Sequence, residues 1–135
     1  MIRVAAGILH REGRVLICQR RSGGPHALKW EFPGGKLKEG ESAESALCRE
    51  LREELSVAVL PARLRNLDTI RHRYPEGPEV EIRFFQVADF SGEPVNLSFE
   101  RIAWVASGDL SGYDFLDADR PLVARVAAGG VLCPD

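Results

Sequence analysis

Apolar and polar residues alternate along several stretches of the chain, as expected for β-strands with one buried face. In residues 79–90, Ile82 and Phe84 fall on one face of the predicted strand and Phe85 on the other. Strands are predicted at residues 2–9, 14–20, 62–73, 79–90 and 102–105, with a short extended segment at 30–32. Turn residues mark the connections, at Arg11-Glu12-Gly13, Ser22-Gly23-Gly24-Pro25 and Pro75-Glu76-Gly77-Pro78.

The apolar period changes to that of a helix in residues 43–55. Ser42 is a suitable N-cap for this helix, and Glu44 lies in the first turn, where the helix dipole favours negative charge. A last helix is predicted to begin at Pro121, because proline suits a first helical position, and to run through Val126. Strands and helices together indicate one mixed α/β domain that spans residues 1–135.

Composition excludes several classes of protein. The chain has 135 residues, of which 44% are hydrophobic and 28% charged, with a net charge of −2, so it lacks the basic surface that binds polymeric nucleic acid. Cys18, Cys48 and Cys133 are scattered, which argues against a disulfide framework and a zinc site; Cys18 and Cys48 read as core residues. The N-terminal apolar run is too short to span a membrane and lacks a cleavage pattern, so we expect a cytoplasmic protein without a membrane partner.

Three glutamates occupy unfavourable positions on the predicted helix of residues 43–55. At 100° per residue, Glu50 and Glu54 overlap or adjoin the leucine stripe, and Glu53 lies close by. Like charges three and four positions apart also repel each other. Two interpretations stand: either Arg49 and Arg52 balance a solvated acidic patch, or a bound cation neutralises the carboxylates.

The residues before the helix favour the cation. Gly34-Gly35 lets the backbone turn tightly and approach a ligand closely. Lys36 offers a positive charge suited to phosphate. Carboxylate oxygens are hard ligands that suit Mg²⁺ or Mn²⁺ bridged to phosphates. The combination predicts a site for a metal-bound diphosphate.

From Gly35 to Val57 the chain resembles the Nudix box, G-x5-E-x7-R-E-U-x-E-E-x-G-U, in which U is a bulky aliphatic residue. Eight of the nine specified positions match, namely Gly35, Glu41, Arg49, Glu50, Leu51, Glu53, Glu54 and Val57. Ser56 replaces the usual glycine, which affects the helix exit but removes no ligand. Outside the box, the segment Trp30 to Lys36 and the run Ala118-Asp119-x-Pro121 also resemble MutT-like members.

The resemblance implies the Nudix fold, an α/β/α sandwich with a mixed β-sheet. It also implies Mg²⁺-dependent hydrolysis of a nucleoside triphosphate to the monophosphate and pyrophosphate, with Mn²⁺ as a second candidate metal. The implied metal ligands are Gly35, Glu50, Glu53 and Glu54, together with Glu100, which stands near Ser98 where MutT-like chains often carry an acid. Glu50, Glu53 and Glu54 are the implied catalytic residues, with Glu50 as the general base. Arg49 is expected to orient Glu41 or Glu53.

The implied substrate-binding residues are Arg21, His26, Phe32, Lys36, Phe84 and Asp119. His26 is equally interpreted as an incidental loop residue and Phe84 as a core residue, while His10 and His72 are expected at the surface. Asp119 either caps the last helix or contacts the base. An ionised Asp119 accepts hydrogen bonds and favours the amines of cytosine or adenine, whereas 8-oxoguanine requires a protonated carboxyl group.

The leading hypothesis is therefore a MutT-like (deoxy)nucleoside triphosphate pyrophosphohydrolase, a monomer or homodimer with a small-molecule substrate. Sanitising the nucleotide pool, as an 8-oxo-dGTP diphosphatase does, and a preference for cytosine or modified pyrimidines are both open. ADP-ribose is a further candidate substrate, disfavoured by the short chain and its MutT-like C-terminal segment. A non-catalytic nucleotide-binding module is motivated by Ser56 and Ser98 and disfavoured by the intact glutamates.

Overall fold

The structure, a computed structural model, describes residues 1–133. Seven strands form a mixed sheet in the order β3-β2-β1-β6-β5, with β4 paired to β1 and β7 paired to β2. Their bounds are β1 Ile2–Arg11, β2 Arg14–Gln19, β3 Trp30–Glu31, β4 Gly34–Lys36, β5 Arg65–Arg73, β6 Glu79–Val87 and β7 Arg101–Ala106. β1 pairs in parallel with β6, antiparallel with β4 and, at its last residues, antiparallel with β2.

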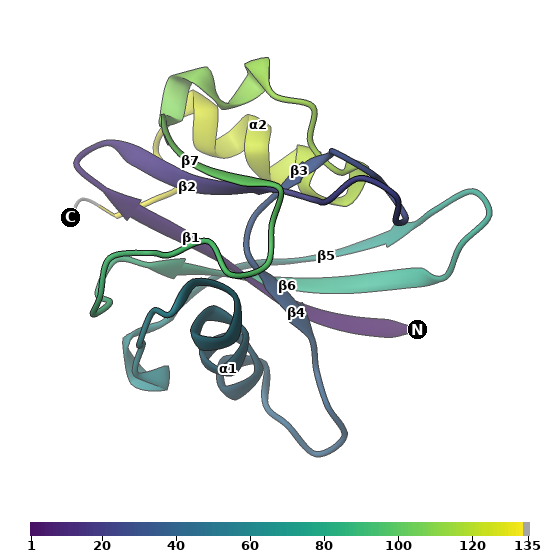
Figure 1. The fold of residues 1–135 in the computed structure, drawn as a ribbon, viewed down its shortest axis with the longest axis horizontal. Helices are drawn as coiled ribbons and strands as arrows, with labels where there is room; N and C mark the ends of the chain where they lie inside the picture. The colour runs from purple at the N-terminus through teal and green to yellow at the C-terminus, as the bar shows by residue number, and fades with distance from the viewer. Residues whose placement is uncertain (134–135) are drawn as a thin grey trace.

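Helices cover the two faces of the sheet (Figure 1). α1 spans Ala43–Leu55 and lies on one side, while α2, Arg120–Ala128, lies on the other. Short 3₁₀ turns occur at η1 Pro61–Arg63, η2 Ser107–Gly112 and η3 Asp117–Asp119. The expected arrangement of a mixed sheet between helices is confirmed. Among the described residues, no helix is long and apolar enough to cross a membrane.

α1 begins and ends where local sequence signals predict. The Ser42 hydroxyl accepts a hydrogen bond from the Ser45 amide at 3.1 Å, which caps the first turn. At the other end Ser56 adopts a left-handed conformation with φ of 59°, the backbone geometry that glycine adopts at least cost. Leu47, Leu51 and Leu55 are fully buried against the sheet. These buried leucines fix the orientation of the helix, and with it the direction of the face that does not pack on the sheet.

Some predicted boundaries are wrong. The strand predicted for residues 62–73 begins only at Arg65, because η1 occupies the residues before it. The strand predicted for 79–90 ends at Val87, and the last helix begins at Arg120, one residue before the predicted proline. The prediction of three unpaired cysteines is confirmed, since all are free, with Cys18 buried and Cys133 exposed.

The prediction of a surface position is wrong for His10, whereas His72 is only partly buried. His10 is only 5% exposed, and its Nε2 lies 2.7 Å from Nε2 of Gln86, which is also buried. His72 is half-buried and packs edge-on against Tyr74, with ring centroids 4.5 Å apart. His10 contacts Gln86 and His72 contacts Tyr74, both on the β5–β6 hairpin. These contacts cannot be read from the position of either histidine in the sequence.

Candidate active site

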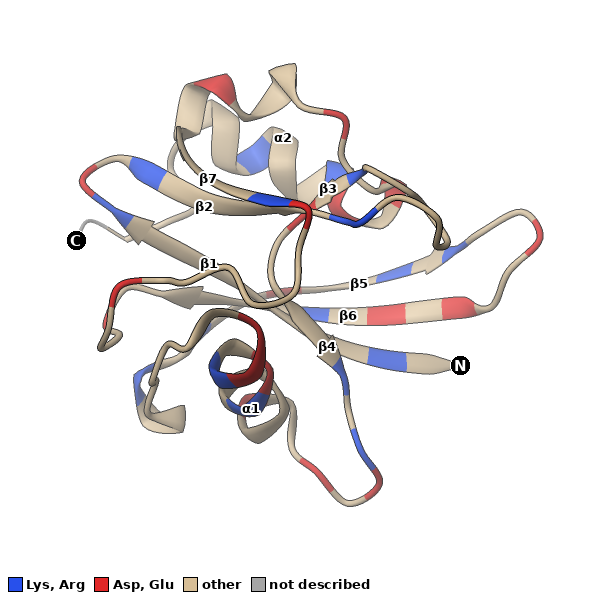
Figure 2. Cartoon of the chain, viewed as in Figure 1, with Lys and Arg blue, Asp and Glu red and all other residues tan. Residues whose placement is uncertain are grey.

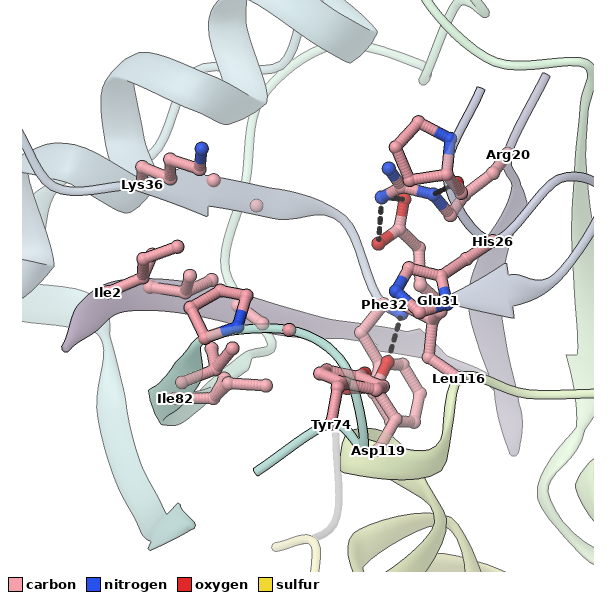
Figure 3. Close-up of a pocket in the computed structure, with 18 of the residues that line it drawn as sticks. Ile2, Arg20, His26, Glu31, Phe32, Lys36, Tyr74, Ile82, Leu116 and Asp119 are labelled. Carbon is pink, nitrogen blue, oxygen red and sulfur yellow. Dashed lines mark hydrogen bonds and ion pairs between the residues drawn. The ribbon is translucent and has the colours of Figure 1, made fainter. Parts of the chain in front are cut away.

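A cavity of about 470 Å³ lies between β1, β3, β4, the β5–β6 hairpin and η3. Figure 3 shows side chains from these elements pointing toward one space, with Lys36 at one end and Asp119 and Tyr74 at the other. Ile2 and Ile82 belong to its apolar side. The polar groups therefore stand at the ends of the cavity, and an apolar floor separates them. This arrangement suits a ligand with a flat apolar part and a charged chain.

Glu54, from the last turns of α1, stands at the charged end of this cavity. It is largely buried, and its Oε1 accepts a hydrogen bond from the Gly34 amide at 3.2 Å. The pKa of Glu54 is raised to about 8, first by burial and then by the neighbouring carboxylates of Glu50 and Glu31. No Lys or Arg among the described residues forms an ion pair with Glu54. A cation bound from solution would neutralise the Glu54 carboxylate, which no described side chain does.

Glu50 lies against the backbone of Gly35. A Cβ atom at position 35 would stand 2.4 Å from Cδ of Glu50, so only glycine leaves room for this carboxylate. Arg49 fixes the same group from the other side, donating to its Oε1 at 2.8 Å. Arg49 also donates twice to Glu41, both at 2.9 Å, and these hydrogen bonds, with one from the Lys38 amide, lower the pKa of Glu41 to about 2. The strand β4 and the helix α1 are thereby joined around the carboxylates.

Glu53 and Glu100 are placed differently from Glu54. The Glu53 side chain is 58% exposed and lies 3.6 Å from Arg49. Glu100 is exposed and lines neither cavity at the site, so the structure does not bring it to the other carboxylates as expected. Within residues 1–133, no three acidic, histidine or cysteine side chains converge closely enough to hold a metal ion.

The residues of the Nudix box nevertheless fit a divalent cation. The acidic positions of α1 gather on the side of the helix toward β4 (Figure 2). Glu54 is buried without a positive partner, and the space above Gly35 is kept free of any side chain but Glu50. Oxygen ligands of this kind are those that Mg²⁺ prefers.

Asp119 lies at the opposite end of the cavity from Lys36 (Figure 3). It is 3% exposed, and its Oδ2 accepts a hydrogen bond from the Phe32 amide at 3.3 Å (Figure 3). Burial raises the pKa of Asp119 to about 8, and the nearby charge of Glu31 acts in the same direction. Its side chain makes no capping hydrogen bond to α2, although it occupies the N-cap position. The capping interpretation is therefore wrong, and the carboxyl group belongs to the cavity.

Two aromatic residues near Asp119 differ in their access to the cavity. Phe32 is buried but lines the cavity. Phe84 is fully buried and lies edge-on behind Phe32, with centroids 6.2 Å apart, so it does not line the cavity and its expected contact with a base is not supported. His26 does line it, with its ring 4.7 Å from that of Tyr74.

Sequence reasoning missed Arg20, Glu31 and Tyr74, which all line the cavity. Arg20 donates to Glu31 at 3.3 Å and to the carbonyl of Pro25 at 3.2 Å (Figure 3). Tandem arginines are visible in the sequence, but which of the two faces the cavity depends on where β2 ends. Glu31 is the last residue of the short strand β3 and directly precedes Phe32. The number of residues between Glu31 and Asp119 in the sequence did not predict that the two lie near each other.

A second cavity of about 460 Å³ adjoins the first. The two share Arg20, Pro25, Glu31 and Glu54. The remaining walls of the second cavity come from the loop of residues 21–24 and from residues 98–99. Arg21 therefore lines only the second cavity, whereas Lys36 and His26 line only the first.

Known proteins share both this fold and these motifs. A family model described as NUDIX domain matches residues 1–126. The chain is 33% identical over 128 residues to a CTP pyrophosphohydrolase from Escherichia coli K12, covering 95% of this chain and 93% of that protein. It is 35% identical over 127 residues to an 8-oxo-dGTP diphosphatase from Haemophilus influenzae, covering 93% and 91%. A crystal structure of a MutT NUDIX hydrolase from Burkholderia pseudomallei matches with a TM-score of 0.83 at 30% identity, covering 93% and 97%.

The chain belongs to the Nudix family, and its similarities are to the MutT-like members. It is accordingly a hydrolase that acts on acid anhydrides in phosphorus-containing compounds. Nudix hydrolases generally use a divalent metal ion and act on small nucleotide substrates.

Proposed function

We propose that the protein is a Mg²⁺-dependent nucleoside triphosphate pyrophosphohydrolase that releases a nucleoside monophosphate and pyrophosphate. The observation that carries this proposal is the position of Glu54. It is a largely buried carboxylate that forms no ion pair with a described Lys or Arg, on α1 beside a cavity that Lys36 also lines. A metal-bound phosphate chain supplies the positive charge that this position lacks, and a nucleoside fills the apolar part.

The proposed metal ligands are Gly35, Glu50, Glu53 and Glu54. A divalent ion bound there supplies polarisation of phosphate oxygens and a lower pKa for an attacking water. Glu50 is the proposed general base, because Arg49 and Gly35 hold its carboxylate in one place. Glu100 stays a proposed additional ligand: it is exposed and, like Glu50 and Glu53, lines neither cavity.

The phosphate chain is proposed to lie between two positive side chains. Lys36 stands on one side of the first cavity, and Arg20 stands at its border with the second (Figure 3). Arg20 is held by an ion pair with Glu31, and both residues line the cavity together with Glu54. Lys36 and Arg20 are both proposed to bind phosphate oxygens. The planar guanidinium group of Arg20 binds them through paired N–H donors, whereas the ammonium group of Lys36 acts as a point charge.

The base is proposed to lie over Phe32 and between Asp119 and His26. A protonated Asp119 offers both a donor and an acceptor, as an amide does, whereas an ionised one only accepts. With a pKa of about 8, Asp119 keeps its proton at neutral pH, which favours an oxidised guanine over cytosine. The names of relatives support both bases, since one is an 8-oxo-dGTP diphosphatase and another a CTP pyrophosphohydrolase. We propose 8-oxo-dGTP as the preferred substrate and nucleotide-pool sanitising as the role.

A panel of nucleotides tests the proposal, with phosphate release measured after added pyrophosphatase, with and without Mg²⁺. The panel contains 8-oxo-dGTP, dGTP, dCTP, 5-methyl-dCTP, 2-hydroxy-dATP and ADP-ribose. We expect Mg²⁺-dependent turnover that is fastest with 8-oxo-dGTP. Fastest turnover with dCTP or 5-methyl-dCTP overturns the assignment of the base, and fastest turnover with ADP-ribose overturns the triphosphate class. Metal-dependent binding without turnover on any member indicates a non-catalytic module instead.

A further inference from the structure

The loop between β2 and β3, residues 20–29, forms a wall of both cavities. Pro25 and His26 line the first cavity (Figure 3), and Pro25 also lines the second. The proposed function places the base beside His26, so the position of this loop bears on nucleotide binding. A contact that fixes the backbone of the loop therefore fixes part of the substrate's surroundings.

The loop has an unfavourable backbone conformation near its end. Leu28 has φ of 62°, in the left-handed region that a bulky side chain adopts only at a cost. His26, two residues earlier, is also left-handed, with φ of 55°. The Leu28 side chain is 46% exposed and lines neither cavity, so its own packing contributes little to this conformation. Contacts of the Leu28 backbone must stabilise it instead.

Gln19, the last residue of β2, supplies such a contact. Its Nε2 donates a hydrogen bond to the carbonyl of Leu28 at 3.1 Å, and its Oε1 accepts one from Nε of Arg101 at 3.0 Å. A carbonyl only accepts and a guanidinium group only donates, so the two bonds together fix the orientation of the amide. The guanidinium group of Arg101 lies over the ring of Trp30, 5.5 Å from its centroid. The amide thus joins the strained end of the loop to strands β3 and β7.

The Gln19 side chain is buried, which makes its hydrogen bonds more important. It is 8% exposed, and a buried amide that loses a partner keeps an unsatisfied polar group away from water. The Leu28 amide in turn donates to the carbonyl of Arg20 at 3.1 Å, so the residue that Gln19 holds also closes the loop. Gln19 lines neither cavity. Any effect of Gln19 on a substrate therefore passes through the loop.

We propose that Gln19 is a positioning residue for nucleotide binding, which holds Leu28 in its left-handed conformation and thereby keeps Pro25 and His26 against the first cavity. This inference rests on the proposed function and adds to it a residue outside both cavities. Without the Gln19 amide, Leu28 lowers its energy by returning to negative φ, and the loop moves away from the substrate. Binding then weakens, whereas the carboxylates of α1 keep their places and the chemical step keeps its rate.

Steady-state kinetics with the triphosphate that turns over fastest test the inference. Gln19→Met roughly keeps the volume of the side chain but removes both hydrogen bonds, and Gln19→Glu keeps the acceptor for Arg101 while setting a carboxylate against the Leu28 carbonyl. For each we expect KM to rise about tenfold and kcat to change less than about twofold. Arg101→Met leaves the bond to Leu28 in place, so it is the matched control, and its KM should rise less than about threefold. Parental KM in Gln19→Met, a lower kcat at unchanged KM, or an equal rise in the control overturns the inference.

A second substitution separates positioning from a general loss of structure. Glycine adopts the left-handed conformation without a steric cost, so Leu28→Gly removes the strain that Gln19 opposes. In the Leu28→Gly background, the rise in KM caused by Gln19→Met should therefore shrink from about tenfold to about threefold. An equal rise in both backgrounds contradicts the inference, because it shows that Gln19 acts on binding independently of Leu28.

Amide hydrogen exchange separates this inference from the proposed function, because it requires no turnover. In Gln19→Met, or in Gln19→Glu where the first variant does not fold, amides of residues 22–28 should exchange about tenfold faster than in the parent, with α1 unchanged. If no nucleotide is hydrolysed but the loop exchanges faster, the proposed function is wrong and the hold of Gln19 on the loop stands. If the parent hydrolyses triphosphates and the loop of the variant exchanges at the parental rate, the inference is wrong and the function stands.

Discussion

The two ends of the first cavity each contain a buried carboxyl group, and the pKa of each is raised to about 8. Glu54 lies among other acids, so Glu50, Glu31 and Glu53 add to the effect of burial. Asp119 is almost fully buried, the Phe32 amide is its hydrogen-bond partner, and Glu31 is its neighbouring acid. Loss of water is the largest cause of the raised pKa at both ends, and the ends differ in their neighbouring charges: three acids act on Glu54, whereas Glu31 raises and Arg20 lowers the pKa of Asp119.

The different surroundings of Glu54 and Asp119 indicate different roles for the two carboxyl groups. An acidic cluster loses its repulsion when a divalent cation binds, so the environment of Glu54 favours a metal ion. A fully buried acid without an ion-pair partner among the described residues is most stable when it keeps its proton, so the environment of Asp119 favours a neutral donor. We therefore expect a substitution at Glu54 to abolish chemistry and one at Asp119 to change the choice of base.

Substitution of Glu54 by glutamine should have the largest effect. The amide keeps the size of the side chain but binds a divalent cation poorly, so kcat on the preferred triphosphate should fall by at least about 100-fold. Glu53→Gln should fall in the same direction. Glu39→Gln, at an exposed position before α1, is the matched control and should leave kcat unchanged. Parental turnover by both glutamine variants at positions 53 and 54 would remove the basis for a metal site.

Substitution of Gly35 by alanine should have the next largest effect. The added Cβ would stand 2.4 Å from Cδ of Glu50 and must displace that carboxylate. Because misplaced catalytic groups lose rate steeply, we expect kcat to fall about 100-fold while KM changes little. Gly108→Ala is the control, since a Cβ there meets nothing within 4 Å. Equal kcat for the two alanine variants is the contrary result.

Asp119 should control selectivity in a way that depends on pH. Below its pKa of about 8 the carboxyl group donates a hydrogen bond, and above that pH it only accepts. The ratio of kcat/KM for 8-oxo-dGTP to that for dCTP should therefore fall about tenfold as pH rises from 7 to 9. Asp119→Asn, which cannot ionise, should keep a high ratio throughout. A flat ratio in the parent, or the same slope in the variant, contradicts this role.

Replacement of Ser56 by glycine should have the smallest effect. Ser56 ends α1 with φ of 59°, a conformation that costs a residue with a Cβ about 1 kcal/mol relative to glycine. The variant should gain up to that amount in free energy of unfolding, measured by urea denaturation, with unchanged kcat. A loss of stability would show that the serine side chain compensates for its backbone.

Local signals predicted the metal end of the cavity better than the base end. Ser42, the leucine stripe and the Nudix box all lie close together in sequence, and α1 forms over the predicted residues 43–55. The role of Asp119 depends on the Phe32 amide, 87 residues away, so a capping function looked equally good from sequence. Spacing along the chain did not reveal such a partner.

The same physical reason explains the other differences. His10 is buried because of Gln86, 76 residues away, although its own neighbours are those of a strand end. Glu100 was expected at the metal because it lies two residues from Ser98, but the chain there leads into β7 and leaves the side chain exposed. Arg20 and Arg21 are adjacent in sequence, yet only Arg20 reaches both cavities.

The thermal unfolding of the parent and of Glu54→Gln, each with and without Mg²⁺, measures most directly whether a cation neutralises the acidic side of α1. Without metal, the variant should unfold at a higher temperature than the parent, because its side chain avoids the crowding of Glu50 and Glu31. Mg²⁺ should raise the unfolding temperature of the parent and leave that of the variant almost unchanged. An equal shift for both proteins, or no shift for the parent, would contradict the account.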